Sequence, residues 1–163
     1  SHKGLPVVNT PLKDLEVTDF LPFECLNEMP WAMTAHVVYE AIDSKRAATI
    51  SPIIIKEIIR DKIGFKGLLL SDDIGMEALS GTKGERARMI LDAGCDLTLE
   101  CSGKIEDMTE VASNLPVMTE EALKRAVTAE NLRKEKCAED GLLYKELLEE
   151  LNTILLAHQN EGA

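Results

Sequence analysis

The sequence predicts an α/β fold in which about three parallel βα units follow one another. Short apolar stretches of strand length alternate with amphipathic stretches of helical length from residue 31 onward. The run Gly67 to Leu70 is apolar on both faces, which is typical of a parallel strand covered by helices on each side. Asp72 and Asp73 follow that run directly. Because parallel sheets carry their chemistry at the carboxyl ends of strands, Asp72 is the best candidate for a reacting residue.

The first third of the chain is expected to be mostly irregular. Residues 1–15 contain glycine and prolines without a sustained period and are expected to form a loop. A short helix is expected within 19–28, begun by Pro22, because proline is tolerated in the first helical turn. Residues 31–38 are expected to form a strand that follows Pro30.

Helix signals flank the central strand. Ser51 and Pro52 are suited to an N-cap and a first helical position, and isoleucines then repeat at helical spacing until Gly64. A second helix is expected over residues 82–93 and is closed by Gly94. A third strand at 96–101 and three helices complete the pattern, the helices being expected at 104–113, 119–138 and 142–158.

Composition excludes several partners. The chain has 163 residues, a formal charge of -11 and 45% apolar residues. Such an acidic surface repels phosphate backbones and anionic lipids, so we expect neither nucleic-acid nor membrane binding. No apolar run approaches the ~18 residues that a membrane span needs.

The cysteines and the first residues bear on compartment and completeness. The four cysteines form no CxxC pair and are expected to be reduced core residues of a cytoplasmic protein. The chain starts at Ser1 rather than at methionine, so we expect it to be a piece of something longer. Three βα units do not close a barrel, which takes at least ~200 residues. The sheet is therefore either small and open or the last part of a barrel.

Six short motifs decide between these alternatives. They follow one another as SHKGLP (1–6), LPF (21–23), MTAHVVY (33–39), ATIS (48–51), GFKGLLLSDDIGM (64–76) and DAGCD (92–96). In order and spacing they resemble the bacterial β-N-acetylglucosaminidases of glycoside hydrolase family 3, up to about Cys101. The resemblance implies a TIM-type (β/α)8 barrel of which this chain supplies the sixth to eighth strands. Residues 1–138 would be the C-terminal part of the catalytic barrel, and 139–163 a helical tail.

The resemblance also implies a reaction. The family removes terminal β-linked N-acetylglucosamine with retention, through a covalent glycosyl-enzyme. By the family's pattern Asp72 is the nucleophile and His2 the acid/base, and no cofactor or metal is implied. We expect the substrate to be a peptidoglycan-derived saccharide, handled during cytoplasmic cell-wall recycling. Because the segments upstream of Ser1 that complete the site are absent here, we expect the chain alone to be inactive.

Three further residues have two interpretations each. His36 and Met76 are candidates for substrate binding, but His36 also fits a hydrogen-bonded core position and Met76 a gap-filler near a pocket wall. We expect Asp73 to cap or support its neighbour rather than to react.

Two other functions stay open. His36, Asp72 and Glu100 follow three successive strands, as the ligands of a metal-dependent barrel hydrolase would. A non-catalytic remnant that binds a sugar is the other alternative.

Overall fold

The computed structural model describes residues 4–139 and 146–153, with side chains described over 4–135 and 146–153. The chain divides into two compact units, residues 1–126 and 127–163. All the strands described belong to the first unit, which also holds the candidate site. In the second unit, residues 146–153 are helical. The rest of the helix expected at 142–158, and His2, lie outside the described residues.

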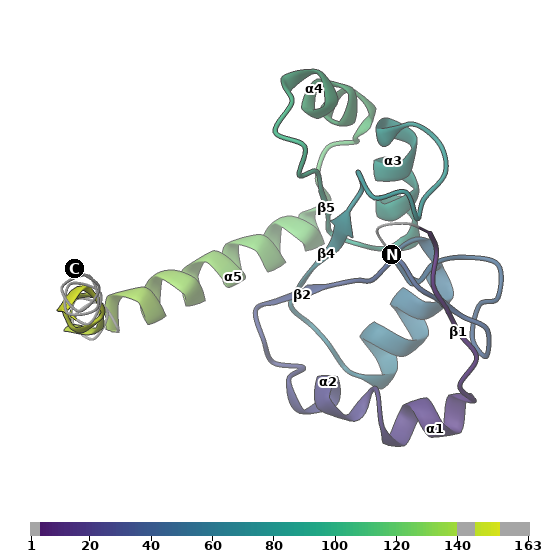
Figure 1. Cartoon of the computed structure of the whole chain (residues 1–163), viewed down its shortest axis with the longest axis horizontal. Helices are drawn as coiled ribbons and strands as arrows, with labels where there is room; N and C mark the ends of the chain where they lie inside the picture. The colour runs from purple at the N-terminus through teal and green to yellow at the C-terminus, as the bar shows by residue number, and fades with distance from the viewer. Residues whose placement is uncertain (1–3, 140–145, 154–163) are drawn as a thin grey trace, which may run out of the picture. The chain divides into compact units, whose positions relative to one another are not determined.

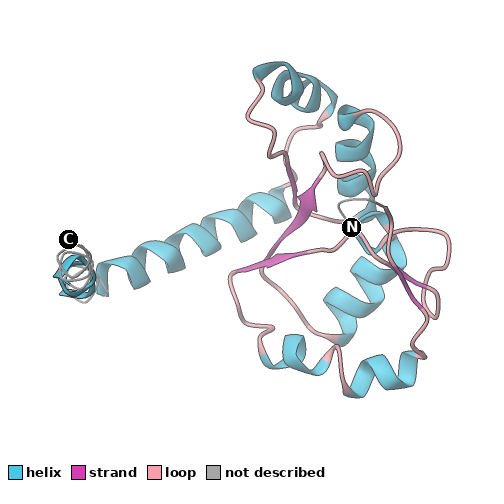
Figure 2. Ribbon diagram, viewed as in Figure 1, coloured by secondary structure: helices cyan, strands magenta, loops and turns pink. Residues whose placement is uncertain are grey.

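The strands of the first unit form two small parallel sheets (Figures 1 and 2). The three-stranded sheet has the order β2-β4-β5 and the other pairs β1 with β3. The strands are β1 (Val7–Val8), β2 (Trp31–Met33), β3 (Val38–Tyr39), β4 (Leu68–Asp73) and β5 (Leu97–Leu99). This confirms the expected α/β class with parallel strands.

Helices lie on either side of these strands. Figure 1 shows α1 and α2 at one end of the first unit and α3 and α4, which pack together, at the other. The helices are α1 (Leu12–Val17), α2 (Leu21–Cys25), η1 (Ala48–Ile50), η2 (Ile54–Lys62), α3 (Lys83–Ala93), α4 (Ile105–Asn114) and α5 (Glu120–Glu139). No helix in the described part of the chain is long and apolar enough to cross a bilayer.

The two helices around β4 have the expected end signals. The Thr82 hydroxyl accepts the Glu85 N–H while the Glu85 carboxylate accepts the Thr82 N–H, so α3 starts with a capping box, and Gly94 ends it at φ +112°. Ser51 Oγ accepts the Ile54 N–H at 3.3 Å at the start of η2. η2 differs from the expected α-helix because its hydrogen bonds have π spacing.

Two expectations for the first forty residues are wrong. Residues 1–15 are not only loop, since β1 lies there and α1 starts there, with Leu15 fully buried on its inner face. The strand expected at 31–38 is two strands, because the Val37 N–H turns back to the Ala35 carbonyl at 3.0 Å. That tight turn redirects the chain, so β3 pairs with β1 while β2 pairs with β4.

A buried ionic group joins β4 to β5 at the start of β5. The Asp96 carboxylate accepts the Leu69 N–H at 2.9 Å and guanidinium N–H groups of Arg60 and Arg125, each at 2.8 Å. Every polar atom of the carboxylate is therefore paired, which offsets the cost of burying it. The two strands are held in register from this end, and the candidate site lies at the other.

Candidate active site

The site lies at the carboxyl edge of the three-stranded sheet. Its strands are parallel, with Met33 beside Leu70 and Leu70 beside Leu97. The residues that follow them therefore come to one edge of the sheet. His36 and Glu100 belong to the segments after β2 and β5, whereas Asp72 lies within the end of β4, which runs to Asp73 and so extends beyond the expected strand. All three lie at the edge that the strand order predicted.

A bulge shapes the end of β4. Leu70 pairs with Leu97 and Asp73 with Leu99, so between these pairs β4 has two residues, Ser71 and Asp72, where β5 has one. The fully buried Ser71 hydroxyl accepts the Leu99 N–H at 3.0 Å, and the Ile74 N–H then reaches the Leu99 carbonyl at 2.9 Å. Bulges of this kind re-aim side chains beside active sites. Here the bulge lies at the aspartate pair.

The two aspartates make different contacts. Asp73 Oδ1 accepts the N–H of Gly75 at 2.9 Å and that of Cys101 at 3.2 Å, so this carboxylate ties the loop after β4 to the segment after β5. Asp72 Oδ1 accepts the Asp73 N–H at 2.8 Å. Within the described residues this is the only hydrogen bond of the Asp72 side chain, which is half-buried. Oδ2 of both aspartates is without a hydrogen bond among the described residues, but only the Asp72 carboxylate ties no other segment in place.

His36 lies beneath this loop, fully buried. Its Nε2 is 3.0 Å from the Asp73 carbonyl oxygen, and its Nδ1 is 3.0 Å from Thr49 Oγ1. Thr49 Oγ1 is in turn 2.9 Å from Thr34 Oγ1. Both ring nitrogens are used within the protein, which leaves neither for a sugar hydroxyl.

Arg86 holds the outer side of the same loop. From α3, its Nη1 donates to the carbonyls of Ile74 at 2.8 Å and Met76 at 3.1 Å, and its Nε donates to that of Gly81. Met76 is only 7% exposed and offers little surface to a ligand. Sequence reasoning gave no role to Arg86, Ser71, Thr34 or Thr49. The last three lie within motifs of the family resemblance, which was the available signal, but the sequence does not show that they meet at the site.

Glu100 belongs to an ion-paired cluster beside the site. The Lys83 ammonium lies 2.5 Å from Glu100 Oε1 and 2.6 Å from Asp107 Oδ2. Hydrogen bonding to Lys83 lowers the pKa of both carboxyl groups, and bonding to Asp107 and then to Glu100 raises the pKa of Lys83. Glu100 is therefore held by its ion pair with Lys83. In the described part of the chain, no group of three His, Cys, Asp or Glu side chains is placed to hold a metal ion.

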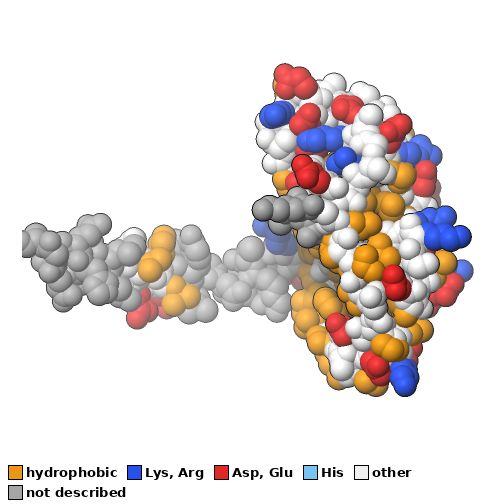
Figure 3. All heavy atoms as spheres, turned by 45° about the vertical axis from the view of Figure 1, so that its right-hand side comes forward, with side chains coloured by type: hydrophobic (Ala, Val, Ile, Leu, Met, Phe, Trp, Pro, Cys, Tyr) orange, Lys and Arg blue, Asp and Glu red, His pale blue; other side chains and the backbone are white. Residues whose placement is uncertain are grey.

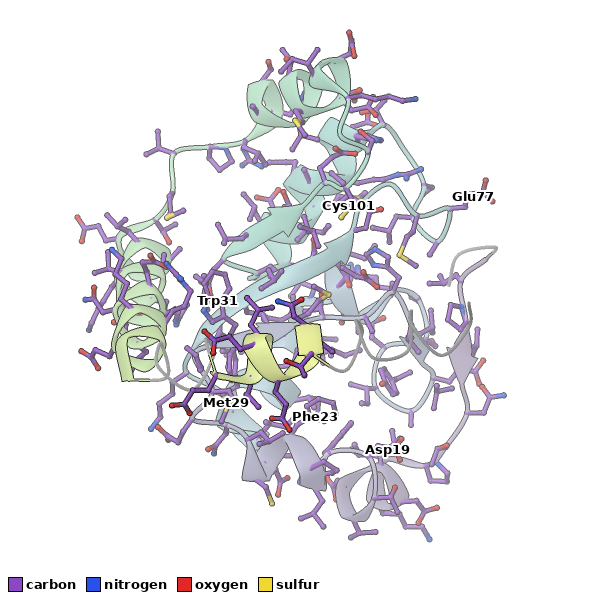
Figure 4. The ribbon with its side chains drawn as sticks, turned by 60° about the vertical axis from the view of Figure 1, so that its left-hand side comes forward. Asp19, Phe23, Met29, Trp31, Glu77 and Cys101 are labelled. Atoms are coloured by element: carbon purple, nitrogen blue, oxygen red, sulfur yellow. The ribbon has the colours of Figure 1, made fainter. Side chains whose placement is uncertain are left out.

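A cavity of the first unit lies away from the two aspartates, although Thr34 and Ala35 form part of its wall. It has a volume of about 300 Å³, and its walls come from α2, β2 and η2, including Phe23, Met29 and Trp31. Figure 4 shows these three side chains close to one another and apart from Cys101, whose N–H bonds to Asp73. Because aromatic and aliphatic side chains form nearly all of its lining, this cavity does not fit a hydroxyl-rich sugar.

The comparisons agree with this architecture. Residues 1–129 match the glycosyl hydrolase family 3 N-terminal domain. The β-hexosaminidase of Neisseria meningitidis serogroup C is 44% identical over 106 residues, which are 63% of this chain and 29% of that enzyme. The β-hexosaminidase of Tolumonas auensis is 38% identical over 109 residues, or 64% of this chain and 32% of that enzyme.

Solved structures show the same likeness. The family 3 β-N-acetylglucosaminidase of Paenibacillus sp. superposes with a TM-score of 0.70 at 29% identity, covering 86% of this chain and 28% of that one. NagZ of Neisseria gonorrhoeae, in complex with N-trifluoroacetyl-D-glucosamine, gives 0.69 at 34% identity, covering 79% and 37%. The chain belongs to glycosyl hydrolase family 3. It spans about a third or less of the curated relatives named here.

Proposed function

We propose that this chain carries the nucleophile half of a retaining β-N-acetylhexosaminidase site. The family membership and the relatives named β-hexosaminidase support the reaction class. The observation that carries the proposal is the contrast between the two aspartates. Asp73 Oδ1 accepts two backbone N–H groups and ties two loops together, whereas the Asp72 carboxylate accepts only the N–H of its own neighbour. Oδ2 of each carboxylate has no hydrogen bond among the described residues.

In the proposed reaction Asp72 Oδ2 attacks the anomeric carbon of a terminal N-acetylglucosamine. The bond from the anomeric carbon to the leaving oxygen breaks, and that oxygen takes a proton from the acid/base, for which the family resemblance indicates His2. Water then gives a proton to the same imidazole and displaces Asp72 from the sugar. The hydrogen bond from the Asp73 N–H to Asp72 Oδ1 fixes which oxygen faces the sugar.

We further propose a peptidoglycan-derived saccharide as the substrate and a cytoplasmic setting. The resemblance supports both, and so does the acidic charge of -11, which disfavours association with anionic membranes. Activity is proposed for the completed barrel, because the match covers only 29% of the Neisseria meningitidis enzyme and the resemblance assigns the sugar-binding residues to other strands.

The test uses a chimera in which the 106 matching residues of this chain replace their counterparts in the Neisseria meningitidis enzyme. Asp72→Ala should lower kcat by several orders of magnitude, because the covalent step is lost. Asp73→Ala should lower kcat far less, because Asp73 only ties two loops. The readout is steady-state hydrolysis of a nitrophenyl N-acetylglucosaminide. Equal losses in the two variants would contradict the assignment of Asp72.

A further inference from the structure

We infer that His36 is a positioning residue that holds the Asp73 backbone, and through it the Asp72 carboxylate, in place for catalysis. The inference rests on the proposed function in one respect, since Asp72 has to be the reacting group for its position to affect turnover. His36 Nε2, the Asp73 carbonyl, the Asp73 N–H and Asp72 Oδ1 form one connected path. His36 is therefore connected to the Asp72 carboxylate through one intervening residue, Asp73.

The hydrogen bonds around His36 have one possible direction in the neutral ring. A carbonyl oxygen carries no proton, so Nε2 has to donate to Asp73. Nδ1 then lacks a proton and has to accept from the Thr49 hydroxyl. The Thr49 oxygen, whose own proton is used, is free to accept from the Thr34 hydroxyl. The two threonines thereby fix the tautomer that serves the Asp73 carbonyl.

Burial makes this arrangement rigid. His36 and Thr49 are fully buried and Thr34 is 5% exposed. A flipped ring would place C–H groups against the carbonyl and the Thr49 hydroxyl, leaving buried polar groups unpaired. The ring therefore holds one orientation.

The Asp73 carbonyl lies at the bulge and has two hydrogen-bond partners. Asp73 pairs with Leu99 across an irregular register, and beyond it the chain turns at once, with the Met76 N–H also reaching the Asp73 carbonyl at 3.2 Å. His36 donates to this oxygen from the neighbouring segment after β2. The backbone that carries the nucleophile is thus fixed from a second strand of the sheet.

A direct substrate contact is the other role considered for His36, and the geometry opposes it. The ring has no exposed surface and both nitrogens have protein partners. A ligand role would make KM the sensitive parameter, whereas a positioning role would make kcat sensitive.

The first test uses the chain itself and does not depend on measuring enzymatic activity. Nitrogen-15 NMR of the His36 ring should show a proton on Nε2 alone, exchanging slowly with solvent. In Thr49→Val that proton should exchange faster, because the ring loses its Nδ1 partner. Thr98→Val is the matched control, since the Thr98 side chain makes no hydrogen bond in the described part of the chain. A proton on Nδ1, or rapid exchange in the unsubstituted chain, would overturn the inference.

The second test measures kinetics in the chimera. His36→Phe keeps the ring's bulk but donates nothing, and kcat should fall about 100-fold, the scale of a small misplacement of a reacting group. KM should stay nearly unchanged. His36→Gln, whose amide can donate from near the Nε2 position, should recover most of the lost kcat. The kcat of Thr49→Val should lie between those of His36→Phe and His36→Gln.

The outcomes separate this inference from the proposed function. If Asp72→Ala is inactive while His36→Phe and Thr49→Val retain full kcat, the positioning role is wrong and the function stands. If Asp72→Ala stays active, the function is wrong, although the NMR result still reports the hydrogen-bond path. A raised KM at constant kcat in His36→Gln would make His36 a substrate ligand instead. If His36→Phe fails to fold, His36→Gln and Thr49→Val decide.

Discussion

Single residues at this site differ more in their contacts than in their chemistry. Asp72 and Asp73 are neighbours of the same type, yet Asp72 accepts only the N–H of its own neighbour while Asp73 joins two loops. The cysteines differ in the same way. Cys95 is buried as the sequence predicted, whereas Cys25 and Cys101 are exposed, which corrects the expectation that all are core residues. The short apolar stretches around the cysteines did not indicate whether each side chain faces the core or the solvent.

Thiol reactivity should follow these environments. Burial raises the pKa of the Cys95 thiol to about 12, so it should react with alkylating reagents only after unfolding. Burial, and then the charges of Asp73 and Glu100, raise the pKa of Cys101, so its alkylation should be slow at pH 7 and speed up at higher pH than that of a free thiol. Mass spectrometry of peptides from the alkylated native chain measures each site. Rapid labelling of Cys95 in the native chain would contradict this description of the core.

Among the elements, those with strong end signals could be predicted from sequence. The capping box and Gly94 bound α3, and Ser51 with its isoleucine repeat located η2. The break between β2 and β3 could not be predicted, because Val37 and Val38 continue the apolar run while a backbone turn ends the strand. The hydrogen-bond path through His36 could not be predicted either, because Thr34 and Thr49 are apart in the sequence and come together only in the folded chain.

The cluster of Lys83, Glu100 and Asp107 joins β5, α3 and α4, and it should make stability depend on pH. The pKa of Glu100 is lowered from 4.5 and that of Asp107 from 3.8. Their contribution to stability is therefore present above these ordinary values and is lost as the pH falls through the lowered pKa values. The pKa of Lys83 is raised from 10.5, so its contribution is full below that pH and is lost as pH rises through the raised value.

Lys83→Met should therefore be less stable than the unsubstituted chain near pH 7, and the difference should shrink as the pH falls through the lowered pKa values of Glu100 and Asp107. Urea midpoints measured across this range check the expectation. Lys56→Met removes an exposed lysine that has no ion pair within the described residues, and it should change the midpoint little at any pH. A difference that stays the same size as the pH is lowered would mean that Lys83 acts by packing rather than by charge.

At the scale of the whole molecule, the first unit presents an apolar surface beside an open sheet edge. β2 ends the sheet order on one side, and large hydrophobic side chains near it are 43–60% exposed, namely Leu21, Phe23, Leu26, Met29, Trp31 and Met33. Figure 3 shows hydrophobic side chains at the surface of this unit. Patches of this kind, next to an unpaired strand, favour association.

The isolated chain should accordingly bind a hydrophobic dye and self-associate as its concentration rises. Phe23→Ser combined with Trp31→Ser should reduce both effects, whereas Val117→Ser, which replaces a single 92% exposed side chain elsewhere, should not. Dye fluorescence and analytical ultracentrifugation are the measurements. A dye-silent monomer with a cooperative melt would instead favour a small open sheet that is complete in itself.

The central claim is that the aspartate at the bulge of β4 becomes bonded to the sugar. Treating the chimera with a fluorinated N-acetylglucosaminyl donor that traps the glycosyl-enzyme, followed by peptide mass spectrometry, tests this most directly. The proposed function predicts that the label is found on Asp72, in the peptide that spans β4. Label on Asp73, or on any residue outside β4, would contradict it.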